Sequence, residues 1–167
     1  IPYKEELSMA EAKTNAMRML ERAKIPYEMH TYDHSDGQID GISVARKVGL
    51  DPDTVFKTLV TRGASREIYV FVLPVAKELD LKKAARSVGE KSIELVKIEE
   101  INKLTGYIRG GCSPLAGKKH YPVFVDESAI LHERIYVSAG HRGVQLRLAP
   151  DDLLRAVEGT YAAIARY

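Results

Sequence analysis

The chain has 167 residues, of which 45% are hydrophobic and 29% charged, a length and composition typical of one globular domain with a buried core. With 25 basic and 23 acidic side chains it lacks the large positive field of a protein that coats nucleic acid, so such a partner would be held by local patches. One cysteine excludes an intramolecular disulfide, and no apolar run approaches the roughly 20 residues of a membrane span, so we expect a cytoplasmic protein with no membrane partner.

We expect an N-terminal extension over residues 1–8, followed by one domain over residues 9–167. The start has no initiator methionine and no signal-peptide pattern, which suggests an incomplete N-terminus. The segment Ser8–Glu11 has the spacing of a capping box and predicts a helix that ends near Lys24. The alternation from Tyr27 to Tyr32 predicts a strand.

The rest of the chain mixes short helices and strands, with glycine, proline and aspartate at their ends. Strands are predicted at 55–61, 68–73, 93–96, 123–125, 134–138 and 144–148, and the first two form a hairpin. Helices or helical turns are predicted at 43–48, 51–52, 81–88, 99–104, near 128 and at 150–167, and loops at 33–41 and 110–117. Because no regular βαβ alternation appears, the sequence predicts an α+β fold.

Lys57 is the charged residue in an otherwise apolar run, Val55–Leu59. A charge in such a run is costly unless it reaches water or a partner. One interpretation is a strand lysine that extends to solvent along its alkyl chain. The other is a cation fixed by apolar neighbours, able to hold a phosphate, a carboxylate or the carbonyl oxygen of an ester.

The loop Gly110–Gly117 is rich in small residues, so its backbone can approach a ligand closely. It offers backbone N–H groups and the Ser113 hydroxyl as donors, and Pro114 restricts its conformation. The segment Ser138–Gly140 could supply a second edge of the same kind. The alternative is a turn that needs a positive φ, since the loop matches neither a nucleophile elbow nor a phosphate-binding loop.

Cys112 is interpreted as a small apolar filler, because a cysteine nucleophile needs a nearby base and the five histidines show no supporting motif. His30 and His34 have a spacing that suits zinc on a helix, but this segment is predicted to be a strand running into a loop. The Cys-x-x-x-His half that would complete such a site is missing, because Ala116 stands four positions after Cys112. We therefore expect no metal and no other cofactor.

Basic side chains gather in three short clusters. They are either solvated faces or local patches that contact phosphates, which supply most of the sequence-independent affinity for nucleic acids. The clusters are Lys82-Lys83-Arg86, Lys118-Lys119-His120, and Arg142 with Arg147.

Six motifs in register from Lys13 to Tyr167 resemble the YbaK family, the aminoacyl-tRNA deacylases related to the editing domain of bacterial prolyl-tRNA synthetases. Each motif is weak alone, but their common order makes the resemblance specific. They are Lys13-Thr14-Asn15-Ala16, His30-Thr31-Tyr32, Val55-Phe56-Lys57-Thr58-Leu59, Pro74-Val75 followed by Leu79-Asp80-Leu81-Lys82-Lys83, Gly110-Gly111-Cys112-Ser113-Pro114, and Tyr136-Val137-Ser138-Ala139-Gly140.

The resemblance implies a compact α+β domain with a curved, barrel-like mixed sheet around one pocket, and metal-free cleavage of the ester between an amino acid and the terminal ribose of tRNA. It implies the following site residues: Lys57, Tyr32, Gly110, Gly111 and Ser113 as catalytic, and Pro114, Ser138, Ala139, Gly140 and Gln145 as substrate-binding. From the basic clusters we expect Lys82, Lys83, Arg86 and Arg142 to bind tRNA. Two positions depart from the family, since Ala139 replaces a glycine and Gln145 stands where some members have an aspartate.

The branch that is most similar acts free-standing on cysteine mis-attached to proline tRNA. In this branch the thiol of the substrate attacks its own ester and releases a cyclic thiolactone, while the protein orients the acyl group and stabilises the oxyanion through Lys57 and backbone N–H groups. Two alternatives stay open: an Ala-tRNA(Pro) deacylase, and a non-catalytic module that binds tRNA or a synthetase. The expected partner is tRNA(Pro), and prolyl-tRNA synthetase is a candidate second partner.

Overall fold

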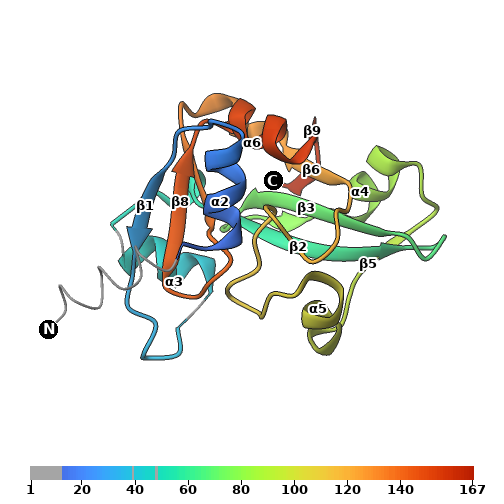
Figure 1. The fold of residues 1–167 in the computed structure, drawn as a ribbon. Helices are drawn as coiled ribbons and strands as arrows, with labels where there is room; N and C mark the ends of the chain where they lie inside the picture. The colour runs from blue at the N-terminus through green and yellow to red at the C-terminus, as the bar shows by residue number, and fades with distance from the viewer. Residues whose placement is uncertain (1–12, 39, 48) are drawn as a thin grey trace, which may run out of the picture.

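The computed structural model describes residues 13–38, 40–47 and 49–167. Its largest element is a five-stranded mixed sheet (Figure 1), in the order β5 (Ile93–Leu95), β2 (Phe56–Gly63), β3 (Ile68–Pro74), β6 (Val123–Asp126) and β9 (Thr160–Ala162). β2 pairs antiparallel with both β3 and β5, whereas β6 and β9 continue the sheet in parallel pairs. The hairpin of β2 and β3 is confirmed, and it lies at the centre of the molecule.

A second, three-stranded antiparallel sheet stands beside the first. It has the order β1 (Glu28–Thr31), β8 (Val144–Leu148) and β7 (Ile135–Ser138). A single parallel bridge between Val55 and Tyr136 joins this sheet to the start of β2. A two-stranded pair, β10 (Ala165–Arg166) with β4 (Glu78–Leu79), completes the strands that the structure describes. The predicted α+β fold with a mixed sheet is therefore confirmed.

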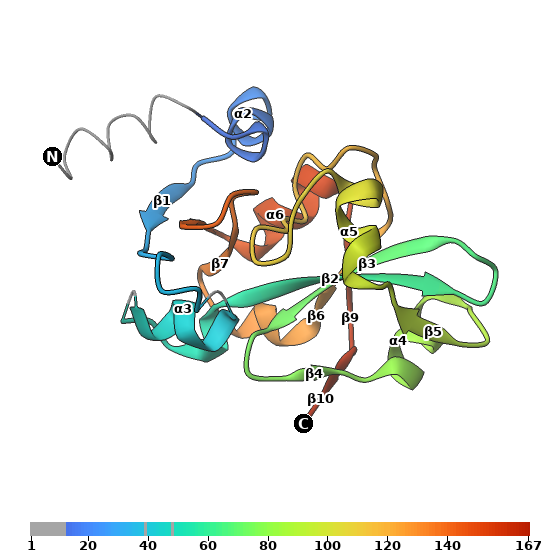
Figure 2. The same cartoon turned by 90° about the horizontal axis from the view of Figure 1, so that it is seen from below.

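Short helices cover the sheets (Figures 1 and 2). The α-helices are α2 (Asn15–Arg22), α3 (Gly41–Lys47), α4 (Leu81–Val88), α5 (Ile98–Thr105) and α6 (Pro150–Val157), and the 3-10 turns are η1 (Pro52–Thr54) and η2 (Glu127–Leu131). Their ends follow the sequence signals: Asp80 caps α4 by accepting from two backbone N–H groups, and Gly89 ends it in the left-handed conformation. None of the helices in the described ranges is long and apolar enough to cross a membrane.

The core consists of two main clusters on opposite faces of the five-stranded sheet. Successive strand residues point to opposite faces, so Val70 and Val72 of β3 join the larger cluster while Phe71 and Leu73 join the smaller one. The larger cluster lies beneath α2 and α6, and α4 covers the smaller one through Ala84. Burial on both faces explains why β3 reads as a continuous apolar run.

The C-terminal segment differs from the prediction of one helix over 150–167. α6 ends at Val157, with Glu158 in the left-handed conformation at φ 53°, and the chain then forms β9 and β10. The buried carboxylate of Asp126 accepts hydrogen bonds from the backbone N–H groups of Ile164 at 3.1 Å and Ala165 at 3.0 Å. These long-range bonds hold the segment extended, and local sequence could not reveal them.

The predicted start of the N-terminal helix is not tested by the structure. The capping box at Ser8–Glu11 lies outside the described residues. Within them, Thr14 caps α2 by accepting from the Met17 N–H at 3.2 Å, and the helix ends at Arg22, close to the predicted end at Lys24.

Candidate functional site

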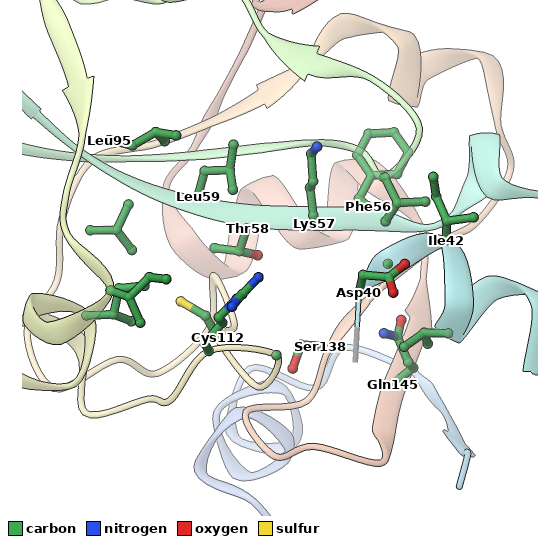
Figure 3. Close-up of a pocket in the computed structure, with 18 of the residues that line it drawn as sticks. Asp40, Ile42, Phe56, Lys57, Thr58, Leu59, Leu95, Cys112, Ser138 and Gln145 are labelled. Atoms are coloured by element: carbon green, nitrogen blue, oxygen red, sulfur yellow. The ribbon is translucent and has the colours of Figure 1, made fainter. Parts of the chain in front are cut away.

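A cavity of about 480 Å³ lies along β2, between α3 on one side and α5 with β5 on the other (Figure 3). On this edge β2 pairs with β5 at Thr61–Gly63 and contacts β7 through the bridge at Val55. Between these two points the described residues provide no strand partner for this edge. The cavity therefore occupies a gap in the sheet.

Most of the cavity wall is apolar, and part of its rim is exposed. Ile42 of α3 is 43% exposed, Leu95 of β5 52% and Ile98 of α5 57%, and all three line the cavity. Exposed aliphatic groups around a concave site favour contact with a ligand that brings an apolar or planar surface. The apolar lining consists of Ile42, Val44, Phe56, Leu59, Val60, Val75, Leu95, Val96, Ile98 and Ile101.

Charges of both signs line the same cavity. Lys57 and Arg109 are the cations, and Asp40 is the carboxylate, among the described lining residues. Lys57 is half-buried, and this burial lowers its pKa, an effect that the negative charge of Glu78 partly offsets. Figure 3 shows Lys57 on the opposite side of β2 from Thr58 and Cys112. Lys57 is thus a cavity lysine with a largely apolar surrounding.

The loop Gly110–Gly117 divides between two cavities. Gly110 and Cys112 line the large one, whereas Ser113 and Pro114 line a second cavity of about 260 Å³. The Ser113 hydroxyl accepts from the Leu115 N–H at 3.1 Å and is buried. The structure thus does not bring Ser113 and Pro114 together with Lys57 in the large cavity, and the serine hydroxyl helps to shape the loop.

Close backbone packing holds this loop against the turn that follows β7. A Cβ atom on Gly111 would lie 3.2 Å from the Arg142 nitrogen, so the glycine lets two backbones approach. The Arg142 guanidinium donates through Nε to the Arg109 carbonyl at 2.7 Å. Gly111 and Arg142 therefore support the cavity wall, of which Arg109 and Gly110 form part.

The segment Ser138–Gly140 adjoins this loop and contributes Ser138 to the cavity wall. Ser138 lines the cavity, and its hydroxyl accepts from the Gly140 N–H at 3.1 Å. Gly140 has φ 94°, and a Cβ atom there would lie 2.8 Å from Cε1 of Tyr107. Ala139 is fully buried in the larger core cluster. Ser138 is therefore in a position to touch a ligand, whereas its two neighbours determine the shape of the turn.

Two side chains of the wall each have a buried oxygen atom without a hydrogen-bond partner among the described residues. Gln145, which pairs with Ser138 between β7 and β8, is only 7% exposed, and its Oε1 has no hydrogen-bond partner among the described residues. The same holds for Oγ1 of Thr58. Buried polar atoms without partners are rare in folded proteins and cost about 1–3 kcal/mol each. Both atoms belong to side chains that line the cavity, where a ligand could supply the missing partner.

Burial raises the pKa of the Cys112 thiol to about 11, so the thiol is protonated at neutral pH.

His30 packs edge-on against Tyr136, and the rings of His34 and His141 lie 6.5 Å apart. The described ranges contain no group of three or more histidine, cysteine, aspartate or glutamate side chains that could hold a metal ion. Tyr32, which follows β1, lines the cavity.

The basic residues expected to contact tRNA fall into two groups. Arg142 lies next to the cavity through its bond to Arg109. Lys82, Lys83 and Arg86 lie on α4, and none of them lines the cavity. Figures 1 and 2 show α4 and α3 at opposite ends of the five-stranded sheet. The α4 cluster is thus remote from the α3 side of the cavity.

Sequence reasoning did not single out two charged cavity residues, Asp40 and Arg109. Asp40 caps α3 by accepting from the Ser43 N–H at 2.9 Å and the Ser43 hydroxyl at 2.7 Å. Its signal was the Asp-Gly pair ahead of a helix, which indicated only a loop end. Arg109 directly precedes the glycine-rich loop, but the residues around it form no further motif that would indicate a binding site.

Comparison with known proteins places the chain in a family. Residues 40–156 match the model of the aminoacyl-tRNA editing domain. A protein of Enterococcus faecalis named "Putative Cys-tRNA(Pro)/Cys-tRNA(Cys) deacylase EbsC" is 43% identical over 152 residues, covering 91% of this chain and 93% of that protein. A proline–tRNA ligase of Shouchella clausii is 29% identical over 147 residues, 84% of this chain but 24% of the ligase.

Solved structures share the fold. The crystal structure of "a putative trans-editing enzyme for prolyl tRNA synthetase" superimposes with a TM-score of 0.76 at 24% identity, covering 90% of this chain and 94% of that one. The hypothetical protein APE2540 superimposes with a TM-score of 0.82 at 20% identity, covering 89% and 97%. The cavity at the gap in the sheet, the matched residues 40–156 and the similarity to the Enterococcus protein over nearly its whole length agree: the chain belongs to the aminoacyl-tRNA editing domain family.

Proposed function

We propose that this protein is a trans-editing deacylase that cleaves the aminoacyl ester of Cys-tRNA(Pro). The observation that carries the proposal is the 480 Å³ cavity, whose apolar wall includes two cations, one carboxylate and two unpartnered polar side chains among the described residues. An aminoacyl ester presents a small side chain, an ammonium group and a carbonyl oxygen that becomes negative during cleavage. The name of the 43% identical Enterococcus protein supports cysteine as the amino acid.

The substrate supplies the nucleophile in this mechanism. The cysteine sulfur forms a C–S bond to its own ester carbonyl carbon, the C–O bond to the terminal ribose breaks, and the ribose oxygen takes the proton that the thiol loses. The products are a cyclic thiolactone and free tRNA. An intramolecular attack with good geometry can gain about 7–11 kcal/mol, so orientation by the cavity is the main contribution of the protein.

In this proposal the backbone N–H groups at Gly110 stabilise the oxyanion. Lys57, whose side chain leaves β2 on the side opposite Cys112, adds its positive charge from the part of the same cavity that passes the open edge of β2. A positioned cation or donor of this kind contributes about 3–4 kcal/mol, or two to three orders of magnitude in rate. Tyr32, Ser138 and Gln145, which line the same cavity, contact the acyl group. The Cys112 thiol takes no part in the attack, because burial holds it protonated.

The terminal phosphates of the tRNA meet Arg109 and Arg142 beside the cavity, and the α4 cluster contacts a more distant part of the acceptor arm. Residues 9–167 constitute the editing domain in this proposal, and residues 1–8 are an extension. Docking on prolyl-tRNA synthetase in the cytoplasm would place the protein where mischarged tRNA(Pro) is released.

The test is single-turnover deacylation of tRNA(Pro) charged separately with cysteine, alanine, serine or proline, with the small product identified by mass. We expect rapid loss of the cysteine ester with release of a thiolactone, and much slower loss of the serine ester, because a hydroxyl is scarcely ionised at neutral pH. Lys57→Ala should abolish the reaction, and Lys91→Ala, which changes an exposed lysine outside the cavity, should not.

Faster loss of alanine than of cysteine would assign the protein to the Ala-tRNA(Pro) type instead. Equal rates for cysteine and serine would favour an attacking water. Binding of charged tRNA without loss of any ester would indicate a non-catalytic module.

A further inference from the structure

Two oxygen-bearing side chains converge at the α3 end of the cavity. Asp40 precedes α3, and Gln145 lies in β8, so they come from parts of the chain that are more than 100 residues apart. Figure 3 shows both at this end of the cavity, with their oxygen atoms turned toward each other. Two acceptors that face each other repel unless a donor lies between them.

The two acceptors have free capacity. Gln145 Oε1 is buried and has no hydrogen-bond partner among the described residues. Each carboxylate oxygen of Asp40 accepts one hydrogen bond from Ser43, and a carboxylate offers about four acceptor sites, so two remain. The same bonds from Ser43 lower the Asp40 pKa, which keeps the group ionised near neutral pH.

The group that fits between them carries several donors, a positive charge and no acceptor. A primary ammonium has three N–H donors and meets all of these requirements. Resting on the proposed deacylation, we propose that Asp40 and Gln145 form the binding site for the α-ammonium group of the aminoacyl substrate. Lys57 and Arg109 also line the cavity, and in the proposed function these cations serve the negative charge of the reacting ester and the phosphate.

This assignment gives Asp40 and Gln145 a positioning role. Holding the ammonium fixes the Cα atom, and with it the orientation of the side-chain thiol relative to the carbonyl carbon. An acyl group without the ammonium would still enter the apolar cavity but would lose both of these contacts. The site therefore favours amino acids over hydroxy acids and over N-acylated amino acids.

Binding of a matched pair of stable analogues tests the site without turnover. Cysteine joined by an amide to 3′-amino-3′-deoxyadenosine carries the ammonium, and the corresponding 3-mercaptopropionyl amide lacks only that group. By titration calorimetry we expect the wild-type protein to bind the cysteinyl analogue at least about tenfold more tightly, the size typical of one hydrogen bond to a charged group. Asp40→Asn should reduce this ratio to near one and leave the affinity for the mercaptopropionyl analogue unchanged.

The variants separate binding from folding. Asparagine caps helices as well as aspartate does, so Asp40→Asn should keep α3 intact, which its thermal unfolding will show. Gln145→Met removes the second acceptor and should also lower the ratio. Asp53→Asn removes an exposed carboxylate outside the cavity and should leave the ratio at its wild-type value.

The outcomes are distinguishable. If the wild-type protein binds both analogues equally, or if Asp40→Asn weakens both by the same factor, the ammonium site is wrong. If the ratio behaves as expected but parallel assays show no hydrolysis of Cys-tRNA(Pro), the ammonium site stands and the proposed deacylation fails. Turnover of Cys-tRNA(Pro) with an unchanged ratio in Asp40→Asn would leave the deacylase and overturn the site.

Discussion

Two threonines on β2 differ in their hydrogen bonds, and the same substitution at each should have opposite effects on stability. The Thr61 hydroxyl donates to the Tyr69 carbonyl at 2.9 Å and is fully buried. The Thr58 hydroxyl is also buried but has no partner among the described residues, and its side chain lines the cavity. Valine has nearly the same shape as threonine without the hydroxyl.

Thr61→Val should lower the free energy of unfolding by about 1 kcal/mol, the usual net contribution of one hydrogen bond. Thr58→Val should raise it by about 1–2 kcal/mol, because it removes a polar atom that is buried without compensation. For a domain of this size these changes shift the melting temperature by about 2–4 °C per kcal/mol. Urea unfolding monitored by circular dichroism measures both variants under the same conditions.

Thr58→Val should also weaken ligand binding. If a ligand supplies the missing partner of Thr58, Thr58→Val should weaken binding of the cysteinyl analogue by a few-fold even though the free protein is more stable. A Thr58→Val variant that is destabilised as much as Thr61→Val would refute the reasoning, because it would mean that the hydroxyl is already satisfied in the free protein.

Four other substitutions test separate parts of the structure. Cys112→Ser should leave the deacylation rate within a few-fold of wild type. Iodoacetamide should alkylate Cys112 roughly 300-fold more slowly than a free thiol at pH 7, because a pKa of about 11 leaves a fraction of about 10⁻⁴ of the thiol as thiolate. Fast alkylation or a trapped acyl-enzyme would contradict this prediction. Lys57→Ala should slow deacylation by roughly two to three orders of magnitude. Because burial lowers the pKa of Lys57, the deacylation rate of the wild-type protein, corrected for spontaneous hydrolysis, should decline at a pH below the ordinary pKa of lysine. Asp126→Asn should destabilise the protein by at least about 2 kcal/mol in urea unfolding. Burial alone would raise the pKa of Asp126, but the hydrogen bonds to its carboxylate outweigh burial and lower this pKa. The stabilisation by Asp126 is therefore present above the pKa of the unfolded state and is lost as the pH falls through the pKa of the folded state, and Asp126→Asn should not show this loss. Gly140→Ala places a methyl group 2.8 Å from Tyr107 at φ 94° and should lower both the melting temperature and the deacylation rate, and an unchanged rate would show that the turn can relax.

The sequence predicted the elements whose ends are marked locally. Asp80 and Gly89 bracket α4, and Gly106 ends α5 in the left-handed conformation, because caps and positive φ values depend on single residues. It did not predict β4, β9 or β10, since these strands have two or three residues each and exist through pairing with distant segments. The tail after Val157 depends on Asp126, about 40 positions earlier, so no local pattern could show it.

The sequence indicated many of the residues that line the cavity, but it did not show how these residues are arranged around it. Lys57, Tyr32, Gly110, Ser138 and Gln145 do line one cavity. A motif lists adjacent residues, however, and adjacent residues in a loop point in different directions. For this reason Ser113 and Pro114 follow Cys112 in sequence but face the second cavity. Asp40 was missed because a helix-capping aspartate looks the same in sequence whether or not it also borders a cavity.

The glycine-rich loop acts differently from the expectation that its donors define the site. Gly111 allows the loop to pack on the backbone of residues 141–142, and the Ser113 hydroxyl is used within the loop itself. These contacts fix Gly110 and Arg109 at the cavity wall, and the fit of Gly140 against Tyr107 fixes the adjoining turn that carries Ser138. A protein that contributes orientation to a reaction of the substrate with itself needs rigid walls more than reactive groups, because the gain from proximity is lost when the geometry loosens. The motif therefore serves the proposed chemistry mainly as a scaffold that holds the Gly110 N–H groups in place. The polar side chains that meet the substrate come from Tyr32, β2, β7, β8 and the start of α3.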